Sequence, residues 1–542
     1  MNKKILHLHR IIKTIIMKIS LLILLFLFSY ISNNAQHTLS GISISLGEKQ
    51  KSKESPFFVQ NDEGVPYYLF RDKKVNLRID RYSEEMKLLS SVSIKLPKSY
   101  EKRVALKFNI INNSLFILSN TYDELKNTTT FYTESFSLDT RDSNDDFEES
   151  AKVENWKWDS GRNLSPDGSK EVWSDITKDN ELNIIVFDKD YSVLNTNHIF
   201  KLDSYDFSYI GGEKLSYSNF SSYRKSVLVD DEGGIYFLRR IHDKTDVKTR
   251  KVTAIVNRMP KVVLDKEEQF YSYTLYRAVK ENDYQLESYP LDAKPGYFIK
   301  DAFLSIIGHD SVIVSGLYSE KDDINSAGVF SIIPRFTNDG PLLIENYLKY
   351  TPEFCTKYTS DWEKSRILAT IAKNGIWDYY NYSKVGFVKY KEGYITFLEQ
   401  QISYRISYNA TNSTTADQRD NLIGVYADKT GGIISIIKVP KRQIGVDKAR
   451  PSLSIHPLDN NNIQFLFNGV NLKKTTSSNS ITAYLMNDEQ LLTQYTIPTK
   501  KEYPGFIMFS NDWLNSTTVV SNVYFLTKKL QHALIKLVID ED

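Results

Sequence analysis

The sequence predicts an all-β fold: a single large β-propeller of seven four-stranded blades, with eight blades as the alternative count. A short hairpin pattern recurs along the chain, and further apolar runs lie between its copies. The 542 residues are 41% hydrophobic and 25% charged, which is typical of a globular chain. We therefore expect one propeller domain over residues 36–542, preceded by a signal peptide over residues 1–35, with one helix inserted near 361–373.

The two best copies of the hairpin pattern are Phe57–Phe70 (FFVQNDEGVPYYLF) and Ser226–Arg239 (SVLVDDEGGIYFLR). In each, an apolar stretch leads into a polar turn that contains Gly, and a second apolar stretch follows. Alternating apolar residues place their side chains on one buried face of a strand. Glycine suits the turn because it adopts positive φ without steric cost. Each copy is therefore expected to be a β-hairpin, with the buried faces supplied by Val, Ile, Phe and Tyr.

Together with looser copies, these place turn centres near residues 63, 113, 167, 232, 309, 392, 460 and 513, a mean spacing of about 64 residues. Several intervals contain a third and a fourth apolar run, such as 252–256 (VTAIV) and 269–279 (QFYSYTLYRAV). Hairpin units of about four short strands are typical of propeller blades, which are sheets arranged radially around an axis. A row of separate β-sandwiches is the alternative. The N-terminal strand Leu39–Leu46 is expected to close the ring by pairing with C-terminal strands such as Ala533–Ile539.

Two of these turns carry a resemblance to known propellers. The segment SVLVDDEGGIYFL resembles the core of NHL-type repeats, and NLSPDGSKEVW resembles the SPDG turn of TolB-like and WD40-like repeats. Both resemblances imply the fold and no activity. The second segment is also similar to the sialidase Asp-box: Ser165 and Asp167 fit. However, Ser169 replaces the motif's Gly, Glu171 replaces its Thr, and Trp173 comes one position late.

The N-terminus has the features of an export signal. Residues Ile19–Ile31 form an apolar run of 13, preceded by five basic and no acidic residues, and Ala35/Gln36 is the expected cleavage point. The run is short for a bilayer-spanning helix, although an uncleaved anchor is the alternative. The signal lacks the following Cys that a lipoprotein needs. We therefore expect a periplasmic or secreted bacterial protein with no integral membrane span after cleavage.

Charge and cysteine content limit the partners. Without residues 1–35 the net charge changes from +2 to about −3, so no basic excess marks the chain as a nucleic-acid binder. The sole cysteine, Cys355, excludes an intramolecular disulfide and is expected to be a small buried hydrophobe. The expected partner is a protein or glycan of the cell envelope, with no nucleic acid involved.

Three segments interrupt the β pattern. An acidic stretch from Asp139 to Glu154 could be a Ca²⁺ loop but is better explained as a solvated loop. Trp156 and Trp158 either form a ligand-binding pair or fill the space between blades. Near residues 361–373, a Ser360/Glu363 capping box, apolar residues from Trp362 to Ile371 and a stop at Gly375 predict a helix on a propeller face. The candidate ligand-binding residues are Trp156, Trp158 and Trp362.

The sequence nominates no catalytic residue, metal ligand or cofactor. The six histidines after residue 35 form no HExxH pair, and neither a GxSxG elbow nor a Walker A loop is present. Two hypotheses of different classes follow. The chain is a non-catalytic binding module, or it is a glycan-active hydrolase or lyase on a propeller scaffold whose carboxylates only the fold can bring together.

Overall fold

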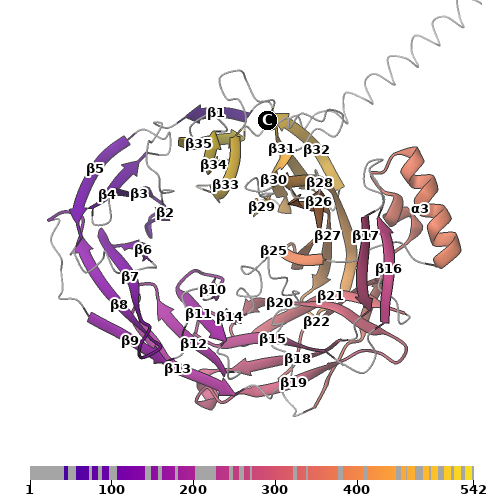
Figure 1. Ribbon diagram of the computed structural model, residues 1–542, viewed down its shortest axis with the longest axis horizontal. Helices are drawn as coiled ribbons and strands as arrows, with labels where there is room; N and C mark the ends of the chain where they lie inside the picture. The colour runs from indigo at the N-terminus through magenta and orange to yellow at the C-terminus, as the bar shows by residue number, and fades with distance from the viewer. Residues whose placement is uncertain are drawn as a thin grey trace, which may run out of the picture.

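The computed structural model describes residues 42–46, 57–72, 76–83, 88–96, 106–140, 148–154, 156, 161–176, 181–201, 227–242, 248–254, 262–268, 271–320, 326–336, 340–375, 382–407, 413–446, 453–458, 461–469, 480–487, 490–497, 506–513, 518–525 and 531–539. Antiparallel sheets stand side by side in a ring (Figure 1). The predicted all-β propeller is therefore confirmed. The expected signal peptide lies outside the described residues.

The first four sheets follow the chain from the inner to the outer strand. Their strands are β2 (Phe57–Gln60), β3 (Pro66–Asp72), β4 (Asn76–Tyr82) and β5 (Leu88–Lys95); β6 (Leu106–Ile111), β7 (Ser114–Asp123), β8 (Thr128–Ser137) and β9 (Glu148–Glu154); β10 (Gly161–Leu164), β11 (Lys170–Ile176), β12 (Glu181–Asp188) and β13 (Val193–Lys201); β14 (Val227–Val229), β15 (Ile235–His242), β18 (Tyr271–Ala278), β19 (Glu287–Asp292) and β23 (Leu342–Leu343).

The remaining four sheets complete the ring. Their strands are β20 (Phe298–Gly308), β21 (Ser311–Ser319), β22 (Gly328–Ile332) and β24 (Asn346–Lys349); β25 (Tyr382–Tyr390), β26 (Gly393–Ser407), β27 (Ser413–Asp428) and β28 (Ile433–Val446); β29 (Leu453–Pro457), β30 (Ile463–Gly469), β31 (Ser480–Asn487) and β32 (Gln490–Ile497); β33 (Phe506–Trp513), β34 (Thr518–Phe525), β35 (Gln531–Ile539) and β1 (Ile42–Leu46). A further hairpin consists of β16 (Lys248–Ala254) and β17 (Val262–Glu268).

Seven of the sheets in the described part of the chain have four strands, as predicted. The fourth sheet has five, because β23 adds to β19 in parallel. Counted with it, the ring contains eight sheets, which is the alternative blade number. In the eighth sheet β1 pairs with β35 from Ile42↔Ile539 to Leu46↔Ile535. The predicted closure of the ring by N- and C-terminal strands is thus confirmed.

The recurring turns join the first and second strands of the sheets. In the first and fourth sheets, the Oδ1 atoms of Asn61 and Asp230 each accept hydrogen bonds from the backbone N–H groups two and four residues later, at 2.6–3.1 Å. Gly64 and Gly233 have φ of +75° and +94°, the left-handed region that favours glycine. The hairpin assignment that rested on these two glycines is confirmed.

The hydrophobic core lies in the spaces between neighbouring sheets. On β15, Tyr236 and Leu238 pack toward the fifth sheet, whereas Ile235 and Phe237 pack toward the third. A strand in the middle of a propeller blade is therefore buried on both faces, not on one as the alternating pattern had suggested. The reason is radial packing: each sheet has a neighbour on either side.

The helical insertion comprises α2 (Pro352–Thr356) and α3 (Asp361–Asn374) and follows β24. The predicted helix, its capping box between Ser360 and Glu363, and its stop at Gly375 (φ +78°) are all confirmed. Its position differs from the prediction. Figure 1 places α3 outside the ring rather than over a propeller face. There Ile367 packs among side chains of the fifth and sixth sheets.

Candidate functional site

Trp156 belongs to the core. It follows β9, has no exposed surface, and its ring meets Phe131 edge to face, with centroids 5.6 Å apart. It packs between the second and third sheets with Trp173 and Phe187. A side chain without exposed surface cannot stack on a ligand, so the prediction of Trp156 as a ligand-binding residue is corrected to the core alternative. Trp158 lies outside the described residues.

Trp362 is the predicted site residue that the structure leaves accessible. It occupies the first turn of α3 and is 70% exposed. The guanidinium of Arg366, one helical turn later, lies 5.3 Å from the centre of the indole ring. This distance is within the range of a cation–π contact, which holds the two side chains together on the surface. The predicted apolar stripe is divided: Ile367 is buried, whereas Trp362 and Leu368 face outward.

The insertion that carries Trp362 is anchored beneath this surface. The Cys355 side chain is 3% exposed and joins Ile367 in the same hydrophobic cluster. Lys438 of β28 donates a hydrogen bond from Nζ to the Cys355 carbonyl oxygen at 2.8 Å. Burial lowers the pKa of Lys438 to about 8. The insertion is thus held to the sixth sheet both by apolar packing and by a buried cation, which fixes Trp362 relative to the ring.

A second aromatic side chain is exposed on the same insertion. Tyr358 lies between α2 and α3, is 47% exposed, and has φ of +63°. Lys357 Nζ lies 5.1 Å from its ring centre. This positive φ is unfavourable for a bulky residue such as Tyr358, so the backbone of the insertion must hold it there. The insertion therefore offers two exposed aromatic rings and an arginine, and Trp, Tyr and Arg are the residue types enriched among binding hot spots. We call Tyr358, Trp362 and Arg366 the rim surface.

A charged network that the sequence did not reveal links the fourth and fifth sheets. Arg277 of β18 donates from Nε and Nη2 to the two carboxylate oxygens of Asp310, each at 2.6 Å, and it also contacts Glu287. Burial lowers the pKa of Arg277, but its hydrogen bonds to the two carboxylates outweigh this and raise the pKa above its ordinary value. The bidentate geometry fixes the turn between β20 and β21 against the fourth sheet.

Asp230 extends this network into the core. Its side chain is fully buried and accepts a hydrogen bond from Tyr236 Oη at 2.9 Å. Burial, together with the Asp230 charge, raises the pKa of Tyr236. The half-exposed His309 has Nδ1 3.6 Å from Asp230 and Nε2 3.7 Å from Glu281. These distances exceed those of a hydrogen-bonded catalytic dyad. His309 therefore lies beside two carboxylates without a hydrogen bond to either.

Among the residues that the structure describes, no group of three or more His, Cys, Asp or Glu side chains could hold a metal ion. Likewise, none of the helices in the described ranges is both long and apolar enough to cross a membrane. The second half of the acidic stretch forms β9, so it is strand rather than the solvated loop that the sequence had suggested.

The chain matches no protein-family model and no curated protein. Among solved structures it is similar to the WD40 domain of SCAP from fission yeast, with 7% identity over 92% of this chain and 98% of that chain and a TM-score of 0.33. It is also similar to the β-propeller domain of the Trilobed protease from Pyrococcus furiosus (9% identity, 82% of this chain, 100% of that chain, TM-score 0.31).

A third similar structure is the acylaminoacyl peptidase from Pyrococcus horikoshii, with 10% identity over 79% of this chain and a TM-score of 0.30. The chain spans about half the length of that peptidase, 51% of it. Because the identities are this low, these similarities concern the fold alone. The low TM-scores support no inference about function. The arrangement of its own sheets makes the chain a β-propeller protein (Figure 1).

Proposed function

We propose that this chain is an exported bacterial envelope protein whose propeller is a non-catalytic binding module for a protein or glycan of the cell envelope. The observation that carries the proposal is Trp362, which is 70% exposed and lies beside Arg366. The exposed indole is a large apolar surface in contact with water. A partner that covered it would remove this surface from water, which is favourable.

The position of the rim surface supports a binding role. The ring of sheets is occupied by mutual packing, since the middle strands are buried on both faces. An insertion outside the ring can vary in sequence without disturbing this packing. Because Cys355 and Ile367 anchor the insertion, the aromatic rings are presented by a fixed support, which reduces the entropy lost when a partner binds.

The export part of the proposal predicts the N-terminus of the mature protein. With cleavage after Ala35, the exported protein should begin at Gln36 and be recovered from the periplasm or the medium. N-terminal sequencing of the protein from each cell fraction measures this. An exported form that still carries residues before Ile31 would contradict it and would favour the uncleaved anchor.

The binding part predicts the effect of Trp362→Ala. Removing an exposed aromatic anchor should weaken partner binding by about 2 kcal/mol, roughly 30-fold in Kd. The free energy of unfolding should change by less than about 0.5 kcal/mol, since surface substitutions rarely matter for stability. Titration of purified protein against envelope polysaccharides, and against proteins retained from an envelope fraction, measures the first quantity. Chemical denaturation measures the second.

Leu125→Ala is the matched control, because Leu125 is 99% exposed at the turn between β7 and β8, in the second sheet. It should leave binding unchanged. Equal binding by the wild-type protein and the Trp362→Ala variant would remove the rim surface from the proposal. Hydrolysis or cleavage of a glycan panel by the wild-type protein would overturn the non-catalytic assignment and favour the hydrolase or lyase hypothesis.

A further inference from the structure

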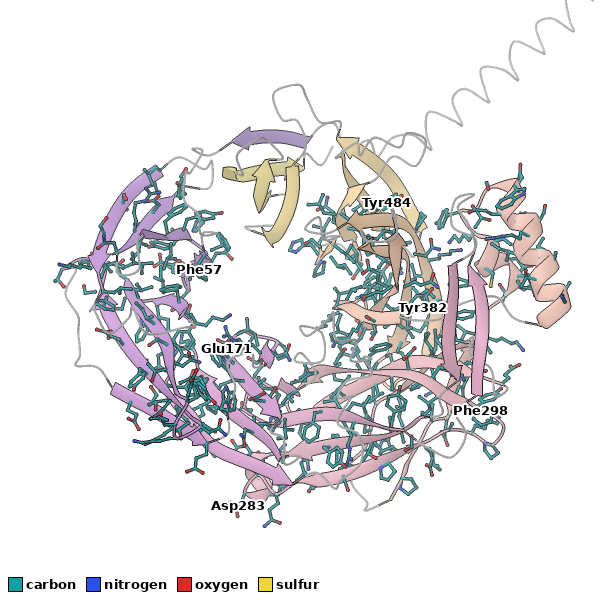
Figure 2. The ribbon with its side chains drawn as sticks, viewed as in Figure 1. Phe57, Glu171, Asp283, Phe298, Tyr382 and Tyr484 are labelled. Carbon is teal, nitrogen blue, oxygen red and sulfur yellow. The ribbon has the colours of Figure 1, made fainter. Side chains whose placement is uncertain are left out.

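Two basic side chains meet near the inner side of the ring, far along the chain from the rim surface. Lys107 lies on β6 and Arg162 on β10, the first strands of the second and third sheets. Figure 1 places both strands on the inner side of their sheets. Glu171 lies on β11, next to β10, and Figure 2 shows it at the same inner side. The three residues therefore come from adjacent sheets to one place.

Arg162 is held by stacking rather than by hydrogen bonds. It pairs with Trp173 across β10 and β11, and its guanidinium carbon lies 3.8 Å from the indole ring centre. Trp173 is 1% exposed and is fixed by Phe131, with ring centroids 5.3 Å apart. No described residue accepts a hydrogen bond from the guanidinium. The indole of Trp173 covers one flat face of the guanidinium. The N–H donors at the edge of the guanidinium remain available, and their geometry suits a planar carboxylate.

The charges at this place are not balanced. Lys107 Nζ lies 3.8 Å from Glu171 Oε1, an ion pair without a hydrogen bond. Two cations thus share one carboxylate. Burial lowers the pKa of both Lys107 and Arg162, and the Glu171 charge opposes this in each case. Partial removal from water strengthens any interaction with an incoming anion, so the surplus positive charge favours a ligand of one negative charge.

We propose that Lys107, Arg162 and Glu171 form a binding site for a carboxylate flanked by hydroxyl groups, as in a uronic acid of an acidic glycan. Arg162 would grip the carboxylate with two parallel N–H donors, and Lys107 would add a third. Glu171 repels the second negative charge of a phosphate, and it accepts hydrogen bonds from neighbouring hydroxyls, which a simple carboxylate does not supply. The site is independent of the rim surface.

The test is calorimetric titration of the mature protein with glucuronate, glucose, acetate, phosphate and a short glutamate peptide. Glucuronate should bind most tightly. Arg162→Met keeps an apolar contact with Trp173 but removes the donors, so it should weaken glucuronate binding at least about 10-fold. Glu171→Gln should strengthen acetate binding and weaken the preference for glucuronate. Lys126→Ala, a loss of charge at a 71% exposed side chain, is the control.

Equal binding of glucose and glucuronate would overturn the carboxylate site, as would an unchanged affinity in Arg162→Met. Tighter binding of phosphate or of the peptide would overturn the assignment to an acidic sugar. If Arg162→Met does not fold, two single variants decide the same question. Arg162→Lys should weaken glucuronate binding, and Glu171→Gln should weaken the preference for glucuronate over acetate. Trp362→Ala should leave the glucuronate titration unchanged, so failure of this site is distinguishable from failure of the rim surface.

Discussion

Replacing Trp156 with alanine is expected to destabilise the protein by about 3–5 kcal/mol, the range for removing a buried large aromatic side chain. Trp156 has no exposed surface and packs edge to face on Phe131 in the space between the second and third sheets. The substitution would leave a cavity that the two sheets cannot close without moving relative to one another. Chemical denaturation of the wild-type and variant proteins measures the difference.

Two comparisons sharpen this prediction. The indole Nε1 of Trp156 has no hydrogen-bond partner among the described residues. Trp156→Phe therefore removes volume without breaking a hydrogen bond and should cost less than the alanine variant. Trp362→Ala, the same substitution at an exposed site, should cost almost nothing. Similar stability losses at Trp156 and Trp362 would contradict the burial of the one and the exposure of the other.

The ring could be predicted from the sequence because its turns carry their own chemistry. Asn61 and Asp230 bond to backbone N–H groups a few residues away, and Gly64 and Gly233 adopt positive φ. Such local features repeat wherever a hairpin repeats, which makes the period visible. The closure of β1 on β35 followed from the same repeat, because a propeller needs a partner for its last strand.

The site residues could not be predicted in the same way, because their environment depends on distant segments. Trp156 is buried by Phe131 and Trp173 of two different sheets. Arg277 is paired with Asp310, which lies 33 residues later in the next sheet. The location of α3 depended on which strands its buried residue, Ile367, would meet. The sequence pattern specified the helix and its caps, but not its place at the rim.

The second large effect is expected at Lys441 and Glu399, an ion pair inside the sixth sheet. The Lys441 side chain is fully buried and that of Glu399 is 5% exposed, with Lys441 Nζ in direct contact with Glu399 Oε1. Burial lowers the pKa of Lys441 to about 7. A carboxylate in contact with an amine favours the charged form of both groups. The two charges therefore stabilise each other in a place that is largely shielded from water, since neither side chain is more than 5% exposed.

Lys441→Met should destabilise the protein by about 3–5 kcal/mol, because it removes the cation in direct contact with the buried Glu399 carboxylate. The double variant Lys441→Met with Glu399→Leu should recover most of that loss, since apolar side chains of similar size need no compensation. A double-mutant cycle on chemical denaturation measures the coupling.

Lys429→Ala is the control. It breaks an ion pair with Glu392 of the same sheet, and the two side chains are 63% and 85% exposed. Water compensates exposed charges, so the control should not change stability measurably. If the single and double variants at Lys441 and Glu399 lost equal stability, the two charges would not be coupled, and packing volume alone would explain the loss.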